Sequence, residues 1–157
     1  MNWSLRYLLP AIGLGAGVAA FLGLMTLEVV YALPGHVVPP DGQDLSDWLD
    51  GFRAAEFTWV LYPAIGCALV WDLLSVALPS YRGDQRVLWL LLWIVSAAAA
   101  ILCISFGTPR EQNGVGIWAP VFTIINGVVI FWLATAPFST VTHKFAPFGS
   151  MAVRRIW

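Results

Sequence analysis

The sequence predicts an all-α membrane protein: four transmembrane helices in an up-down bundle, with a short amphipathic helix in the outer loop. Composition is the first reason, because 59% of the 157 residues are hydrophobic and only 11% are charged. Soluble domains typically carry about 25% charged residues. The second reason is that the hydrophobic residues form runs of about 20 residues, enough for a helix to cross roughly 30 Å of hydrocarbon. The third is that prolines and glycines mark the ends of these runs.

The whole chain, residues 1–157, is expected to form a single membrane domain. The predicted spans cover about residues 7–33, 57–78, 87–107 and 115–136. Residues 34–56 would form the outer loop and residues 137–157 a cytoplasmic tail. The first run exceeds the apolar core of a signal peptide, which has about 7–15 residues, so we expect it to be retained as a span. The short later connections are expected to join antiparallel neighbours.

The basic residues predict that both termini lie in the cytoplasm. On the side that holds the termini, the spans are flanked by Arg6, Arg82, Arg86, Lys144, Arg154 and Arg155. Only Arg53 and Arg110 fall on the opposite side. Since lysine and arginine concentrate near the cytoplasmic ends of spans, this asymmetry fixes the predicted orientation. The expected location is the inner (plasma) membrane of a bacterium.

Small residues in the first span predict a closely packed helix face. Two series recur every four positions: Gly13 and Gly17, and Gly15, Ala19 and Gly23. Small side chains let two helix backbones approach closely, and dispersion then holds the helices together. The residues assigned to helix packing are Gly13, Gly17, Ala20 and Gly23. Their partner helix is expected either within this chain or on another subunit.

The outer loop contains an amphipathic helix pattern. Leu45, Trp48, Leu49 and Phe52 recur at helical spacing, with charged residues between them. One interpretation is a short helix on the outer surface, with Trp48 and Phe52 inserted into the membrane interface or used to dock a partner. The other is a loop helix that caps the bundle.

Glu28 and Asp72 are the only acidic or basic side chains inside the predicted spans. A carboxylate in hydrocarbon is expensive, so each is expected to have a partner or a role. At 1.5 Å per residue, Glu28 lies about 12 Å from the membrane centre toward the outer face, and Asp72 lies about 7 Å from the centre toward the inner face. A depth difference of about 19 Å excludes a catalytic dyad, which needs a separation near 5–10 Å. The two acids are therefore either stations on a proton or ion pathway or separate structural anchors.

Two further polar residues are candidates. Asn126 lies near the middle of the fourth span, where its amide needs an interhelical hydrogen bond or serves a site. His36 lies in the outer loop, within possible reach of Glu28. Neither His36 nor His143 is inside a span, which excludes a bis-histidine haem within this chain alone.

No motif for catalysis, nucleotides or metals is found in the sequence. We therefore assign no catalytic residue, metal or cofactor to this chain alone, and we expect bound lipids. A net charge of −1 without a basic aromatic patch excludes nucleic acid as a partner.

Three functions remain open. Sparse functional groups, the small-residue face and an aromatic tail ending in Trp157 favour an accessory or structural subunit of a larger membrane complex, without catalytic activity of its own. The first alternative is a homo-oligomeric transporter coupled to protons or ions through Glu28 and Asp72. The second is a membrane enzyme that acts on a lipid or quinone at the outer interface, with Glu28 and His36 as acid–base groups.

Overall fold

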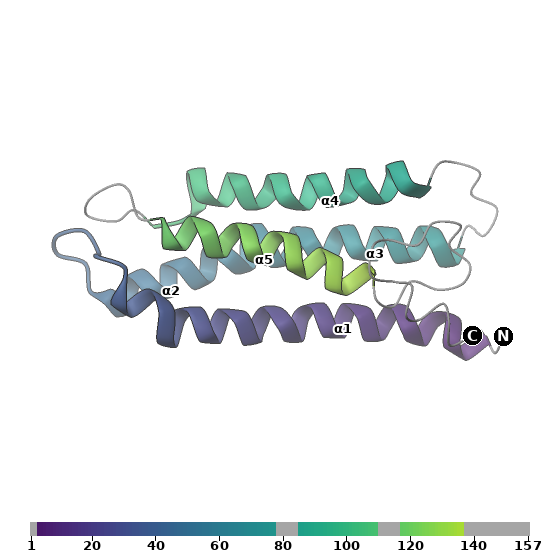
Figure 1. Ribbon diagram of the computed structural model, residues 1–157, viewed down its shortest axis with the longest axis horizontal. Coiled ribbons are helices and arrows are strands. Elements are labelled where there is room, and N and C mark those ends of the chain that lie inside the picture. Colours follow the sequence, from purple (N-terminus) through teal and green to yellow (C-terminus); the bar gives the residue numbers. More distant parts are fainter. Residues whose placement is uncertain (1–2, 78–84, 110–116, 137–157) are drawn as a thin grey trace.

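Four long helical segments form a bundle in the computed structural model (Figure 1). The structure describes residues 3–77, 85–109 and 117–136. Its α-helices are α1 (Trp3–Leu27), α2 (Leu45–Glu56), α3 (Tyr62–Ala77), α4 (Gln85–Leu102) and α5 (Trp118–Thr135). Within the described ranges, four segments are long and apolar enough to cross a membrane. For the part of the chain that the structure describes, the prediction of an all-helical membrane protein with four spans is therefore confirmed.

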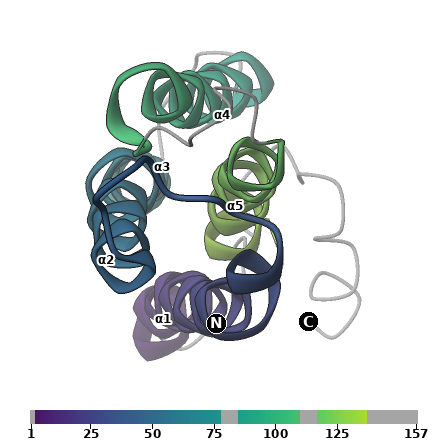
Figure 2. The same ribbon diagram turned by 90° about the vertical axis from the view of Figure 1, so that its left-hand side faces the viewer.

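Seen end-on, the helices follow one another around the bundle in the order α1, α3, α4 and α5 (Figure 2). Helix α5 packs against α1, α3 and α4, so it contacts every other span. The connection between α1 and α2 crosses over one end of the bundle (Figure 2). The predicted tail at residues 137–157, which includes Trp157, lies outside the described residues.

The second span begins earlier than the sequence predicted. Helix α2 continues through a π-helical turn, η3 (Phe57–Leu61), directly into α3, and the apolar segment runs from Leu45 to Leu74. Trp48 and Phe52 are fully buried, and their stacked rings lie 5.7 Å apart between centroids. The expectation that these two rings insert into the lipid interface is therefore wrong. An amphipathic pattern shows that one helix face is covered, but it does not distinguish lipid from protein as the cover.

Small residues bring α5 close to its neighbours. A Cβ atom built on Gly17 of α1 would lie 3.0 Å from the Cβ atom of Ala134. One built on Gly127 would lie 2.7 Å from the Cβ atom of Ala100 on α4. Gly13 is buried on the same side of α1 as Gly17. This face of the first span thus packs against a helix of the same chain.

The second series of small residues lies on the outside of the bundle. Gly15, Ala19 and Gly23 are exposed, whereas Ala20 is partly buried. A Cβ atom built on Gly15 or Gly23 would meet nothing within 4 Å. Gly15, Ala19 and Gly23 therefore form an exposed strip on α1, which lipid or another protein can contact.

Gly127→Ala is expected to destabilise the bundle by about 1–3 kcal/mol, because the new methyl group would overlap the Cβ atom of Ala100 and force α4 and α5 apart. Thermal unfolding in detergent would measure the loss. Gly66→Ala on α3 is the matched control, since a Cβ atom there meets open space. Equal stability of the two variants would contradict the close approach of α4 and α5.

Candidate functional site: a buried acid cluster

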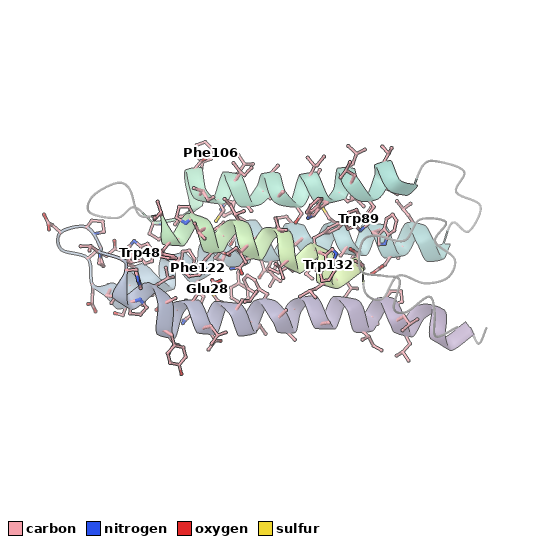
Figure 3. All side chains as sticks on the ribbon, in the orientation of Figure 1. Glu28, Trp48, Trp89, Phe106, Phe122 and Trp132 are labelled. Atoms are coloured by element: carbon pink, nitrogen blue, oxygen red, sulfur yellow. The ribbon has the colours of Figure 1, made fainter. Side chains whose placement is uncertain are left out.

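Four buried polar side chains meet between α1, α2 and α5. They are Glu28, Glu56, Thr123 and Asn126, and we call them the buried acid cluster. Glu28 is 4% exposed and the other three side chains are 0% exposed. Figure 3 shows Glu28 between α1 and α5, toward the end of the bundle where α2 begins. The cluster is thus enclosed by protein near one end of the spans.

The amide of Asn126 joins the two carboxylates. Its Nδ2 atom donates one hydrogen bond to Oε2 of Glu28 and one to Oε2 of Glu56, each over 3.1 Å. Both amide hydrogens are therefore in use. The Oδ1 atom of the same side chain is buried and has no hydrogen-bond partner among the described residues.

The hydroxyl of Thr123 adds a second contact to Glu56. Its Oγ1 atom is hydrogen-bonded to Oε1 of Glu56 and lies 3.0 Å from the carbonyl oxygen of Ala119. A hydroxyl has only one hydrogen, so it cannot donate to both oxygens at once. With a proton on Glu56, the acid donates to Thr123 and Thr123 donates to Ala119. The geometry can therefore accommodate a neutral acid at Glu56 with every one of these contacts satisfied.

Irregular helical turns surround the cluster. Glu28 is the first residue of the π-helical turn η1 (Glu28–Ala32), and Glu56 immediately precedes η3. A third such turn, η4 (Cys103–Gly107), extends α4 and contacts both α2 and η3. Turns of this kind occur frequently at functional sites, where the inserted residue changes the direction of side chains. Both glutamates thus lie where their helices depart from regular geometry.

Among the side chains that the structure describes, in residues 8–74, 87–109 and 117–136, no basic one neutralises the two glutamates. The ion pair that the described part contains, between Arg53 and Asp50 at 3.0 Å, lies on the exposed side of α2. Burying a carboxylate without a counter-charge is costly, and placing a second one beside it adds repulsion. The chemistry open to this arrangement is to hold a proton or to bind a cation.

Asp72 and His36 lie apart from the cluster. Asp72 is buried on α3, 16 residues beyond Glu56 along one continuous helix, which corresponds to about 24 Å. The imidazole of His36 is exposed, with Nδ1 2.8 Å from the carbonyl oxygen of Ala32 and the ring 5.1 Å from that of Trp118. The structure therefore brings Glu28 and Asn126 together and leaves Asp72 and His36 elsewhere.

Glu56 is the residue that sequence reasoning missed. It directly precedes the predicted span and was assigned to the outer loop, although it is fully buried. A signal was present, because the apolar stripe through Trp48 and Phe52 reaches Ala55 and Glu56 one turn later. Extending the helix by that turn would have placed a carboxylate on its buried face.

The fold and the cluster together define an integral membrane protein with an enclosed pair of carboxylates. Comparison with protein-family models, with curated proteins and with solved structures gives no match to this chain. Because a fold alone does not specify a function, the chemistry of the cluster is the basis for a functional argument.

Proposed function

We propose that this protein is a small membrane transporter coupled to protons or cations, with Glu28 and Glu56 as its ion-binding pair. The proposal rests on the hydrogen-bonded chain Glu28–Asn126–Glu56. Among the side chains that the structure describes, no basic group forms an ion pair with either glutamate. Carboxylates enclosed in membrane spans commonly belong to proton relays and ion pathways. In this proposal Glu56 replaces Asp72 as the partner of Glu28.

A purely structural role explains the cluster less well. An interhelical contact requires one donor and one acceptor, and a neutral pair would supply both at lower cost. The chain instead encloses two acids around one amide. Since buried charged contacts are weak sources of stability, a function in binding is the better reason for the second acid.

The proposed orientation places the cluster toward the outer side of a bacterial inner membrane. The basis is the excess of basic residues around the opposite ends of the spans, where both termini would be cytoplasmic. The exposed acids Asp41, Asp44, Asp47 and Asp50 lie in or beside the start of α2, at the same end as the cluster. Such a concentration of negative charge raises the local concentration of cations and speeds their arrival.

Proton flux across liposomes tests this function. Full-length protein reconstituted with an entrapped pH-sensitive dye should speed the response to an external acid pulse when the membrane potential is clamped. Glu28→Gln and Glu56→Gln should each return the rate to that of protein-free liposomes, because an amide cannot take up the proton. Asp47→Asn, an exposed acid of α2, should keep the wild-type rate. Full flux in both glutamine variants would rule out the pair as the proton carrier.

The second candidate function is that of an accessory subunit in a larger membrane complex. It is favoured by the exposed strip of Gly15, Ala19 and Gly23 on α1, which a helix from another chain fits. A second copy of this chain fits the same strip, and a transporter with only four spans would require it. Native mass measurement of the detergent-extracted protein distinguishes a homo-oligomer from a complex with different subunits.

The third candidate, a membrane enzyme, has less support. Its acid–base pair would be Glu28 and His36, yet Glu28 is buried against Asn126 and His36 is exposed on the turn after α1.

A further inference from the structure

We propose that the buried acid cluster binds one Na⁺ or Li⁺ ion in exchange for one proton, with the side-chain amide of Asn126 turning over to present its oxygen. This inference rests on the proposed function and specifies the ion. It concerns equilibrium binding, so it can be tested without any transport measurement.

The cluster offers only oxygen atoms as ligands once that amide has turned. They are carboxylate oxygens of Glu28 and Glu56, the hydroxyl of Thr123 and Oδ1 of Asn126. Carboxylate, hydroxyl and carbonyl oxygens suit hard cations. The two carboxylate oxygens that share Nδ2 are each 3.1 Å from it, so they are at most about 6 Å apart. A small cation between them would require only a modest inward movement.

The unused oxygen of Asn126 is an independent observation that points to a ligand. Oδ1 is fully buried and accepts no hydrogen bond from the described residues. Buried polar atoms are nearly always paired, so an exception calls for a physical reason. Without a cation, Nδ2 of Asn126 donates hydrogen bonds to the two carboxyl groups and Oδ1 accepts none from the described residues. When a cation lies between the carboxyls, rotation of the amide turns the idle oxygen into a ligand.

The charges balance for a one-for-one exchange. With a proton on each glutamate the cluster is neutral. When one monovalent cation enters and one carboxyl releases its proton to water, one carboxylate balances the ion and the other glutamate stays protonated. The cluster is therefore neutral in both states, which keeps the cost of burial low in each.

The ligand set favours a small monovalent ion. Calcium requires six to eight oxygen ligands, and magnesium normally keeps several of its waters. The four side chains carry six oxygens, which reaches the lower limit for calcium only if both carboxylates bind through both of their oxygens, and side chains at most 4% exposed leave few waters to complete the shell. Among the described residues, no three histidine, cysteine, aspartate or glutamate side chains come together, which argues against a transition metal.

The elements around the cluster determine which other groups respond to pH. From α5 come Thr123 and Asn126, which do not titrate in the accessible range. From η4 comes the thiol of Cys103, which is buried and close enough to Glu56 to interact with it electrostatically. A Cys103→Ala background therefore removes this thiol as a source of released protons.

Proton release on addition of salt tests the inference. Full-length protein in detergent, in weakly buffered solution with a pH indicator, would receive NaCl, LiCl, KCl or choline chloride at equal ionic strength. Na⁺ and Li⁺ should each release about one proton per chain, since cation binding displaces protons from its ligands. Choline and K⁺ should release none. Thr123→Val and Asn126→Leu should weaken the Na⁺ response, whereas Thr58→Val, an exposed threonine of η3, should not.

The outcomes separate this inference from the proposed function. Equal proton release with all four salts, or none with Na⁺, would overturn the exchange. A glutamate-dependent proton flux without a Na⁺ effect would leave the proton-coupled transporter standing and remove only the cation. Na⁺-dependent release that disappears in Glu56→Gln would support the binding site even if liposomes show no flux. A matching rise of the unfolding temperature in Na⁺ would confirm that the folded state binds the ion.

Discussion

Asn126→Leu should lower the free energy of unfolding by about 3–5 kcal/mol at alkaline pH, where both carboxyls of the cluster are ionised; this is the range expected when one partner of a buried charged contact is removed. Leucine has a similar branched shape, although it is larger, and it donates no hydrogen bond. Glu28 and Glu56 would then face each other without the Nδ2 group that now contacts both over 3.1 Å. The cost should shrink as the pH falls, because protonation of both carboxyls removes their repulsion and gives each a hydrogen to donate.

A double-mutant cycle would assign this loss to the acids. Combining Asn126→Leu with Glu56→Gln should restore much of the stability, because only one carboxylate would then remain. Ser96→Ala is a suitable control, because the buried Ser96 hydroxyl donates a long hydrogen bond of 3.4 Å to the carbonyl oxygen of Gly127. Loss of this bond should lower the free energy of unfolding by about 0.5–1.5 kcal/mol. An Asn126→Leu cost that is independent of pH and of Glu56 would show that the effect is one of packing.

Phe52→Ala should also destabilise strongly, by about 3–5 kcal/mol, because it removes a fully buried ring and leaves a cavity. The ring stacks on Trp48 where α2 enters the bundle, so its loss should loosen the segment that positions Glu56. Chemical or thermal unfolding in detergent would measure the change.

Phe106→Ala is the matched control for that experiment. The Phe106 ring is 78% exposed and points away from the bundle (Figure 3), so its loss should change stability by no more than about 0.5 kcal/mol. If the two phenylalanine variants were equally stable, α2 would behave as a helix on the membrane surface, as its amphipathic pattern first indicated.

The membrane depths predicted from residue position within each span were wrong for Asn126 relative to Glu28. They placed Asn126 near the membrane centre and Glu28 about 12 Å outward, yet their side chains are in hydrogen-bond contact. Helix α5 has 18 residues whereas α1 has 25, and α5 lies toward the end of the bundle that holds the cluster (Figure 1). Relative shifts between helices depend on packing contacts such as Gly17 against Ala134, and no single span encodes them.

The predicted separation in depth between Glu28 and Asp72 agrees with the structure. The sequence separated these acids by depth and excluded a dyad, and the structure keeps them at different levels of the bundle. The comparison works because the two positions lie on opposite sides of the middle of their spans, with a predicted difference in depth of about 19 Å. An error of a few residues in either span does not bring them together.

The sequence by itself determined that this is a four-span helical membrane protein and that Glu28 and Asn126 require explanation. Those conclusions depend on the free-energy cost of exposing backbone polar groups and charged side chains to hydrocarbon. That cost applies to each segment separately, whatever it packs against. Only the tertiary structure decided that α2 continues into the second span and that Glu56 joins Glu28 around one amide. Contacts between residues about 70 to 98 positions apart arise from how helices pack together, and the local pattern of any one helix is compatible with several such arrangements.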